Sequence, residues 1–194
     1  EIPDEDIDVV IPIPESSITS GTQVARTLNK DLAYGFVKNR YVGRTFIMPE
    51  QQLRKASVRR KLNPINDEFK DKKVLLVDDS IVRGTTMKEI VAMCYKAGAK
   101  KVSVASAAAK VCFPNVYGID MAAKKDLIAS SRTNDEIRDF LGCDNLVYQS
   151  LEDLEASVLE LNSDLNKVEK SIFNGVYPTD ISSDYLEKLE VKRG

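Results

Sequence analysis

The apolar positions alternate between short β-branched runs and segments with helical spacing. Uninterrupted apolar runs bounded by turn residues predict buried strands, which we place at 7–13, 34–37, 74–77, 101–108 and 146–148. Apolar residues three and four apart predict helices at 19–29, from about 85 to 97, and at 134–141. A strand–helix–strand succession favours a mostly parallel, twisted sheet flanked by helices, so the predicted fold class is α/β.

Capping residues locate several helix ends. We expect Thr19 or Ser20 to cap the first helix, because short hydroxyl side chains accept hydrogen bonds from its free N–H groups. Gly98 suits the position just after the helix that precedes it. Ser150 is expected to cap a further helix over 151–161.

Acidic residues dominate the last quarter of the chain, where two more helical pieces are predicted at 164–170 and 183–191. We therefore expect a domain over 1–150 and a helical C-terminal extension over 151–194 packed on it. The chain opens without a methionine, just before an apolar strand, which suggests a piece of a longer protein.

Composition excludes several classes of protein. The 194 residues are 43% hydrophobic and 30% charged, which suits a soluble domain with a real core, and no apolar run approaches the roughly 20 residues of a membrane span. The net charge of −2 favours no nucleic-acid partner. Histidine is absent, which removes a Ser-His-Asp triad and a His-ligated zinc. Three scattered cysteines without a CxxC pair fit a reducing, cytoplasmic location.

A basic segment interrupts this pattern at 38–73. Its eleven basic and four acidic residues give it a charge of +7 within a chain of net −2. Long stretches with weak periodicity inside a domain are usually functional lids, so we expect a flexible loop that closes over an anionic ligand. The alternative is a solvated charged face.

The segment 74–86, VLLVDDSIVRGTT, carries the clearest chemistry. Its apolar strand delivers Asp78 and Asp79 to the carboxyl edge of the sheet, where open α/β sheets bind ligands. Residues 80–86 form a hydroxyl-rich turn with one glycine and open a helix, whose N-terminus attracts anions. A phosphate cradle beside two acids suits a phosphorylated sugar. The alternative is an ordinary strand–turn–helix without a binding site, in which the acids cap the helix.

This segment resembles the phosphoribosyl pyrophosphate (PRPP) signature of the type I phosphoribosyltransferases. The blocks DVVIPIPESS, GFVKNRYVGRTFIMPEQQLR, SVRRKLNPI and FPNVYGIDM are similar, in order and spacing, to the glutamine PRPP amidotransferase family. The resemblance implies a type I phosphoribosyltransferase fold. It also implies transfer of ammonia, derived from glutamine in the full enzyme, to PRPP, which gives 5-phosphoribosylamine and pyrophosphate in the first step of purine biosynthesis.

The resemblance further implies roles for individual residues. Mg²⁺ would be held by Ser16, Asp78 and Asp79. Catalytic roles would fall to Asp78, Asp79, Lys38, Arg40 and Tyr41. PRPP would be bound by Ser16, Ser17, Asp78, Asp79, Ser80, Ile81, Val82, Arg83, Gly84, Thr85 and Thr86. Ammonia would pass along Arg44, Thr45, Ile47 and Asp120.

Partners are implied in the same way. AMP and GMP would act as inhibitors, and the full enzyme would be a homotetramer with an N-terminal glutaminase domain. Nothing in this chain resembles that domain, so we expect it to use ammonia directly. Its tail over 171–178, SIFNGVYP, lacks the cysteines that hold an iron–sulfur cluster in some members, so no cluster is expected.

Other functions remain open from the sequence. A related transferase with a nucleobase acceptor would need stacking rings, for which Phe113 and Tyr117 are candidates. A non-catalytic PRPP or nucleotide sensor would share the fold. Nucleic-acid binding through the basic segment lacks a recognisable recognition motif.

Overall fold

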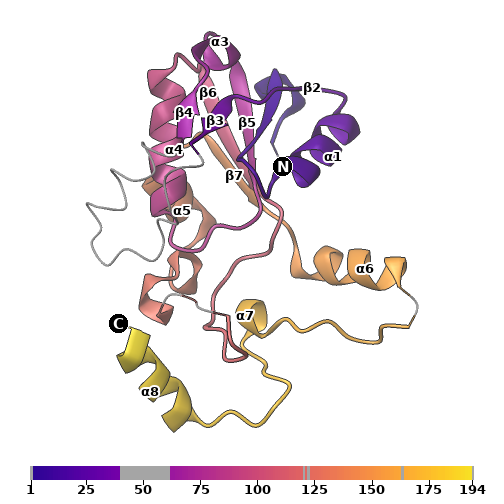
Figure 1. The fold of residues 1–194 in the computed structure, drawn as a ribbon, viewed down its shortest axis with the longest axis vertical. Helices are drawn as coiled ribbons and strands as arrows, with labels where there is room; N and C mark the ends of the chain where they lie inside the picture. Colours follow the sequence, from indigo (N-terminus) through magenta and orange to yellow (C-terminus); the bar gives the residue numbers. More distant parts are fainter. Residues whose placement is uncertain (1, 40–61, 120, 122, 163, 194) are drawn as a thin grey trace.

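A parallel five-stranded sheet forms the centre of the computed structural model, which describes residues 2–39, 62–119, 121, 123–162 and 164–193 (Figure 1). The strands are β1 (Val9–Pro12), β2 (Asp31–Leu32), β5 (Lys73–Asp78), β6 (Lys101–Ser106) and β7 (Asn145–Tyr148). Their order across the sheet is β2-β1-β5-β6-β7, and every pairing is parallel. The predicted parallel α/β sheet is confirmed.

The register of the sheet fixes where its polar residues stand. β1 is buried along its whole length and pairs with β5 from Val9 opposite Val74 to Pro12 opposite Val77. Such continuous apolar runs are typical of strands covered on both faces. Asp78 is the next residue of β5, so the first acid stands directly after the last residue that pairs with β1.

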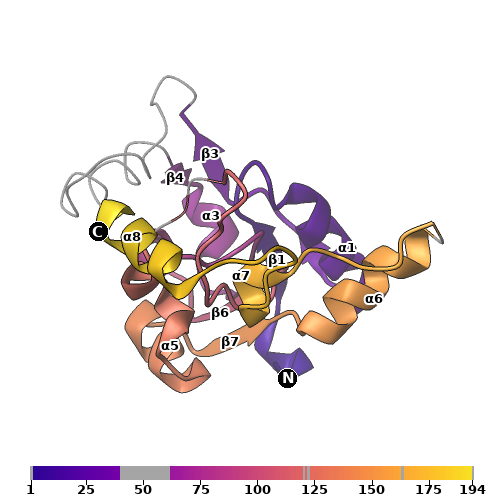
Figure 2. The same cartoon turned by 90° about the horizontal axis from the view of Figure 1, so that it is seen from below.

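Helices cover both faces of this sheet, as Figure 2 shows. On one face, Ala25 of α1 (Ile18–Leu28) packs with apolar residues of β1 and β5. On the other face, α4 (Thr85–Lys96) and α5 (Asn134–Leu141) contribute to the larger core cluster, which includes Leu76. Within the part of the chain that the structure describes, no helix is long and apolar enough to cross a membrane.

A small hairpin stands apart from the main sheet. β3 (Phe36–Lys38) pairs antiparallel with β4 (Leu62–Pro64), and the short helix α3 (Asn66–Phe69) follows. Phe69 is fully buried, with its ring centroid 5.1 Å from that of Phe36. The prediction of one flexible loop over 38–73 is therefore wrong at its described ends, because apolar contacts order them. Residues 40–61 lie outside the described residues.

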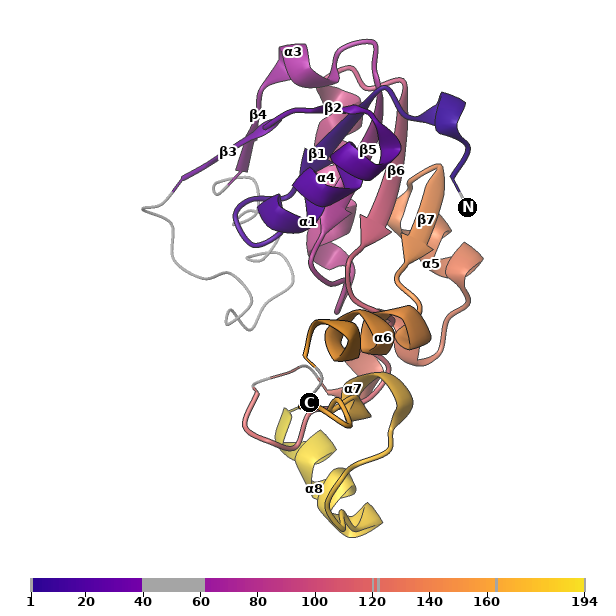
Figure 3. The same ribbon diagram turned by 90° about the vertical axis from the view of Figure 1, so that its right-hand side faces the viewer.

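The C-terminal helices gather beyond the carboxyl ends of the strands (Figure 3). They are α6 (Leu151–Leu161), α7 (Ser171–Asn174) and α8 (Ser183–Arg193). The prediction of a helix at 164–170 is wrong, since these residues form no helix and bury no side chain. A segment of this length without a buried face is marginal as a helix. The domain boundary at 150 stays a prediction.

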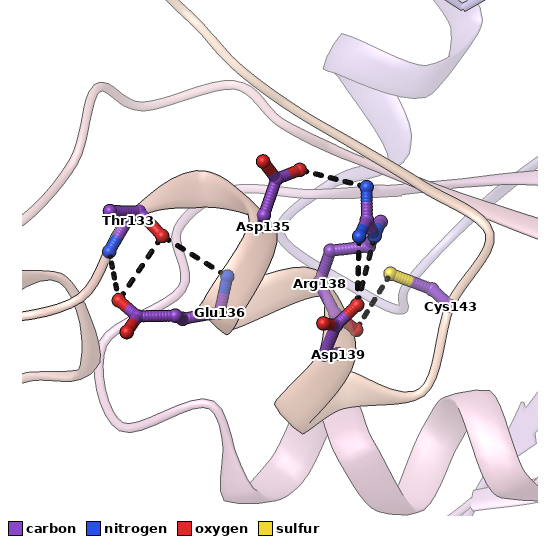
Figure 4. Close-up of polar contacts among 6 residues, drawn as sticks. All are labelled: Thr133, Asp135, Glu136, Arg138, Asp139 and Cys143. Atoms are coloured by element: carbon purple, nitrogen blue, oxygen red, sulfur yellow. Dashed lines mark hydrogen bonds and ion pairs between the residues drawn. The ribbon is translucent and has the colours of Figure 1, made fainter.

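The helix ends follow the expected chemistry with one exception. Ser150 caps α6, and its Oγ accepts a hydrogen bond from the Asp153 N–H at 3.0 Å. Thr133 and Glu136 form a reciprocal capping box at the start of α5 (Figure 4). The exception is α1, whose N-cap is Ser17 rather than Thr19 or Ser20. The hydroxyl of Ser17 makes no hydrogen bond to its own helix and instead donates to Asp78, the last residue of β5.

Candidate active site

Two loops meet at the carboxyl edge of the sheet through Ser17 and Asp78. The buried Ser17 hydroxyl donates a hydrogen bond to Asp78 Oδ1 at 3.0 Å, and the Asp79 N–H donates to the same oxygen at 3.0 Å. The strand order reverses between β1 and β5, and such switch points are where open α/β sheets bind ligands. The sequence motif thus lies at the position where the topology predicts a ligand.

The carboxyl group of Asp78 is electrostatically unusual. Burial and, to a smaller extent, the nearby charge of Asp79 raise its pKa to about 6, although the Ser17 hydroxyl and the Asp79 N–H act in the opposite direction. At neutral pH the ionised carboxylate is therefore held in a place that disfavours its charge. A hydroxyl donor or a cation would relieve that cost.

The backbone of the two acids is fixed from the side of β6. The N–H groups of Ala107 and Ala108 donate to the carbonyl oxygens of Asp78 and Asp79, both at 2.9 Å. The buried Ser106 hydroxyl in turn donates to the Ala108 carbonyl at 2.8 Å. These bonds hold the acids in place through the main chain and use none of their carboxylate oxygens.

Gly84 shapes the turn between the acids and α4. It is the N-cap of α4 with φ of 73°, a left-handed conformation that side chains disfavour. A Cβ atom at this position would lie 2.4 Å from Ile128 Cδ1. Because glycine offers no capping side chain, the first N–H groups of α4 can serve a phosphate.

The side chains between Ser80 and Gly84 turn toward the protein. Ile81 belongs to the main core, Val82 packs in a second apolar cluster, and Arg83 Nη2 lies 3.7 Å from Asp126 Oδ2. Contacts of these three residues with a phosphate would therefore be made through the backbone. Thr85 and Thr86, at the start of α4, are half-buried and exposed respectively.

The loop after β1 brings a predicted lid residue to the same edge. Lys38, the last residue of β3, donates to Glu15 Oε2 at 3.1 Å. Ser16 is exposed beside the buried Ser17, and the peptide bond from Pro14 to Glu15 is cis. The structure thus brings Ser17, Asp78 and the turn together. The other predicted positions, Arg40, Tyr41, Arg44, Thr45, Ile47 and Asp120, lie outside the described residues.

The acid pair fits a magnesium ion that shares its ligand shell with a substrate. In the described ranges no group of three or more Asp, Glu, Cys or His side chains could hold a metal alone. Mg²⁺ is usually bound by only one or two carboxylates together with substrate phosphates and water. Asp78, with its raised pKa, and the adjacent Asp79 have this chemistry.

A cavity of about 480 Å³ lies elsewhere, in the C-terminal extension. It is lined by Gly175, Tyr177, Thr179, Asp180, Ile181 and Ser182. None of these is a predicted site residue, and their side chains offer no cluster of bases for a phosphate. We therefore centre the candidate site on the acids rather than on this cavity.

The residues that pack against the turn or bond to the backbone of the acids were not identified from the sequence. Ile128 closes over Gly84 and donates its N–H to the Val82 carbonyl at 2.9 Å. Ala107 and Ala108 fix the acids, as described above. Ordinary apolar residues remote in sequence give no local signal of such roles. The small residues directly after β6 were the one available hint, because close backbone approach needs small side chains.

A parallel sheet with paired acids and a glycine-capped helix at its switch point is the arrangement expected of the phosphoribosyltransferase class. The chain belongs to the phosphoribosyl transferase domain family, whose model matches residues 3–113.

Within that class the chain is most similar in the comparisons to amidophosphoribosyltransferases. The enzyme of Escherichia coli (strain K12) is 58% identical over 98% of this chain and 38% of that protein, and the Saccharomyces cerevisiae enzyme is 52% identical over 97% and 37%. The chain thus spans about two fifths of the length of these relatives.

Solved structures agree with this placement. Glutamine PRPP amidotransferase from B. subtilis, complexed with ADP and GMP, superposes with a TM-score of 0.77 at 40% identity, over 91% of this chain and 39% of that one. A structure described as the allosteric regulatory enzyme of purine biosynthesis gives a TM-score of 0.79 at 40% identity, over 96% and 40%. The predicted phosphoribosyltransferase fold and the family resemblance are confirmed.

Proposed function

We propose that this chain is the phosphoribosyl-transferring part of a glutamine PRPP amidotransferase. It would join ammonia to PRPP and release 5-phosphoribosylamine and pyrophosphate, the first step of purine biosynthesis. The observation that carries the proposal is the junction of Ser17 with Asp78 beside the glycine-capped α4, in a chain 58% identical to a named amidophosphoribosyltransferase.

The proposal gives each part of PRPP a partner in the chain. The 5′-phosphate would accept hydrogen bonds from the N–H groups at the start of α4. The ribose hydroxyls would donate to Asp78 and Asp79. The pyrophosphate would lie by residues 15–17, within reach of Lys38, which already lies beside Glu15 at that edge.

The reaction breaks the bond from C1 of the ribose to the pyrophosphate oxygen and forms a bond from C1 to nitrogen. Positive charge develops on the ribose, and the ionised acids stabilise it electrostatically. Bound Mg²⁺, held by Asp78, Asp79 and Ser16, would supply neutralising charge for the departing pyrophosphate. Ammonia carries its own lone pair, so no histidine base is needed, and the product nitrogen loses its extra proton to solvent.

The partners follow from the same proposal. A glutaminase domain would supply ammonia in the full enzyme, which we propose to be a cytoplasmic homotetramer without an iron–sulfur cluster. AMP and GMP would compete with PRPP for the phosphate-binding turn, and the B. subtilis structure with ADP and GMP supports nucleotide binding in this family.

A nucleobase acceptor is less well supported. The Phe113 ring has Lys124 Nζ at 5.0 Å and packs against Gly175. The Tyr117 ring meets the Tyr177 ring edge-on at a centroid distance of 6.4 Å. Both candidate stacking rings are therefore engaged in packing within the protein.

The test is pyrophosphate release from PRPP and Mg²⁺ with ammonium salt at mildly alkaline pH. Wild-type protein should release pyrophosphate much faster when ammonia is present, and Asp78→Asn with Asp79→Asn should reduce the ammonia-dependent rate by about 100-fold or more. Glu152→Gln, which removes an exposed acid from α6, serves as the matched control.

Two outcomes would contradict the proposal. Release that depends on adenine, hypoxanthine, guanine or orotate instead of ammonia would reassign the chain to a nucleobase transferase. Tight PRPP binding by calorimetry, with no release under any of these conditions, would indicate a sensor.

A further inference from the structure

The loop after β6 is bonded to the segment around α7 along much of its length. We call these the β6 loop (residues 107–119) and the α7 segment (residues 171–179), and they lie side by side in Figures 1 and 3. The N–H groups of Cys112 and Phe113 both donate to the Ile172 carbonyl, at 2.9 and 3.0 Å. The two segments are thus joined through the main chain over about 60 positions of sequence.

Two tyrosine hydroxyls extend this contact. The Tyr177 hydroxyl donates to the Pro114 carbonyl at 2.7 Å. The Tyr117 hydroxyl lies 3.0 Å from Thr179 Oγ1 and accepts from the Thr179 N–H at 3.3 Å. The hydroxyls reach across the boundary in opposite directions, so each segment holds the other.

Close packing accompanies these bonds. A Cβ atom on Gly175 would lie 2.8 Å from Phe113 Cε1, so a larger residue there would force the segments apart. Inside the β6 loop, the buried Asn115 accepts from the N–H groups of Tyr117 and Ile119 at 2.9 and 3.1 Å. These bonds fix the local conformation of the β6 loop, so its place on the domain is set by its anchoring contacts.

The other end of the β6 loop is anchored to the acids. Ala107 and Ala108 donate to the carbonyls of Asp78 and Asp79. Val82, in the turn after those acids, packs in one apolar cluster with Val111, Leu127, Ile172 and Phe173. The α7 segment is therefore bonded to the β6 loop and shares an apolar cluster with the turn proposed to bind phosphate.

The strand order suggests which side of the substrate this arrangement serves. The acids follow β5, the proposed pyrophosphate loop follows β1 on one side, and the β6 loop follows β6 on the other. In an oxocarbenium-like displacement the incoming group approaches the face opposite the leaving group. The β6 loop is thus on the side from which an acceptor would reach C1.

We propose that the α7 segment is a positioning element for the acceptor side of the site, and that Tyr177 is its main positioning residue. Tyr177 would not touch substrate but would set the place of the β6 loop through Pro114. This inference rests on the proposed function. It gives part of the C-terminal extension a role, exerted through the β6 loop, in selecting ammonia over water as the acceptor.

The experiment replaces Tyr177 by phenylalanine in the full chain and follows two products. Attack by ammonia gives phosphoribosylamine and pyrophosphate, whereas attack by water gives ribose 5-phosphate and pyrophosphate. Because phosphoribosylamine itself hydrolyses to ribose 5-phosphate, the share due to water is measured as the pyrophosphate released without ammonia. Tyr177→Phe should raise KM for ammonia by about fivefold, the scale of one lost hydrogen bond, and raise the share of ribose 5-phosphate. KM for PRPP should stay within about twofold of the wild-type value.

Two further variants sharpen the test. Tyr185→Phe removes the same atom from a tyrosine of α8 that is 46% exposed, and it should change neither parameter. Tyr117→Phe removes the second bridging hydroxyl and should move the product ratio in the same direction as Tyr177→Phe. The melting temperatures of all three variants show whether a change in kinetics reflects unfolding.

The possible failures are distinguishable. A wild-type chain that gives no ammonia-dependent product overturns the proposed function and this inference with it. An active wild-type chain whose Tyr177→Phe and Tyr117→Phe variants keep the product ratio and the KM for ammonia overturns this inference alone. Equal increases in KM for ammonia and for PRPP would also overturn it, because they would indicate a general structural role.

Discussion

The hydroxyl of Ser17 donates to Oδ1 of Asp78 at 3.0 Å, although Ser17 is also the N-cap of α1. A serine at this position normally accepts from its own helix, which stabilises the helix by about 1 kcal/mol. Here its side chain makes no such bond and instead orients a carboxylate 61 positions away. The candidate site thus uses the Ser17 hydroxyl, which would otherwise stabilise α1 as its N-terminal cap.

Replacing Asp78 by asparagine should stabilise the metal-free protein at neutral pH. Burial and the charge of Asp79 raise the folded-state pKa of Asp78 to about 6, above the roughly 3.9 of an unfolded chain. Because the folded state then holds its proton more tightly, this group makes the wild type lose stability as pH rises from about 4 to 6. The full difference, about 3 kcal/mol, should be present above pH 7.

Urea unfolding in EDTA buffer between pH 4 and 8 measures this difference. The two proteins should converge toward pH 4 and diverge above pH 6, with Asp78→Asn the more stable. Asp153→Asn, a change on exposed α6, should leave the pH profile of the wild type intact. Parallel profiles for Asp78→Asn and the wild type would show that folding does not raise the pKa of Asp78.

Replacing Gly84 by alanine should destabilise the fold more than the same change at Gly142. Both glycines have φ of 73°, so alanine is strained at either position. A Cβ on Gly84 would lie 2.4 Å from Ile128 Cδ1, whereas nothing lies within 4 Å at Gly142. We expect a loss of about 1 kcal/mol for Gly142→Ala and about 3 kcal/mol for Gly84→Ala.

Denaturation midpoints and PRPP affinity together check this prediction. Gly84→Ala should also weaken PRPP binding, since the turn must shift away from Ile128, while Gly142→Ala should bind PRPP normally. Equal losses of stability for the two variants would mean that the contact with Ile128 relaxes freely.

The sequence predicted the central elements because their signals are local. α5 and α6 match their predicted bounds, and β1, β5 and β7 lie within one or two residues of theirs. β2 was missed, since its two residues carry no pattern. The ordered ends of the basic segment were missed for another reason. The aromatic pair Phe36 and Phe69, far apart in the chain, stabilises them.

The candidate site also has a part that could be predicted from a local motif and a part that could not. Asp78, Asp79 and Gly84 stand in one motif, so their strand, turn and helix could be predicted together. The bond from Ser17 to Asp78 and the closure of Ile128 over Gly84 depend on how strands are ordered, which no local pattern encodes. For the same reason, no local pattern indicates that Tyr177 bonds to the loop after β6.

Replacing Thr133 by alanine should destabilise the protein through α5. Thr133 Oγ1 accepts from the Glu136 N–H at 3.3 Å, and Glu136 accepts from the Thr133 N–H at 2.8 Å (Figure 4). Losing such a cap costs about 1 kcal/mol. The helix carries the buried Ile137 and Leu141, so its fraying would be transmitted to the core.

Ser150→Ala is the matched control for this cap. Ser150 caps α6 with a similar bond of 3.0 Å, but α6 has no buried residue. Fraying of α6 should therefore cost less than about half of the Thr133→Ala loss in global stability by urea denaturation. A larger effect at Ser150 would show that α6 stabilises the domain more than its burial indicates.

The three cysteines should differ in reactivity toward iodoacetamide in the native protein. Burial raises the pKa of Cys94 to about 12 and that of Cys143 to about 11, and the thiolate is the reactive form. Cys94 is fully buried in the main core, and Cys143 packs there too, with Sγ 3.8 Å from the Arg138 carbonyl (Figure 4). Cys112 is half-buried, so although burial also raises its pKa, it should be labelled first.

Mass spectrometry of the alkylated protein at pH 8 gives the order directly. One label at Cys112 should appear while the protein is folded, and all three should appear in urea. This order also tests whether Cys94 is protected by its packing, because a packed thiol gains reactivity only as fast as its surroundings open. Native labelling of Cys94 at the rate of Cys112 would show that α4 separates from the sheet without global unfolding.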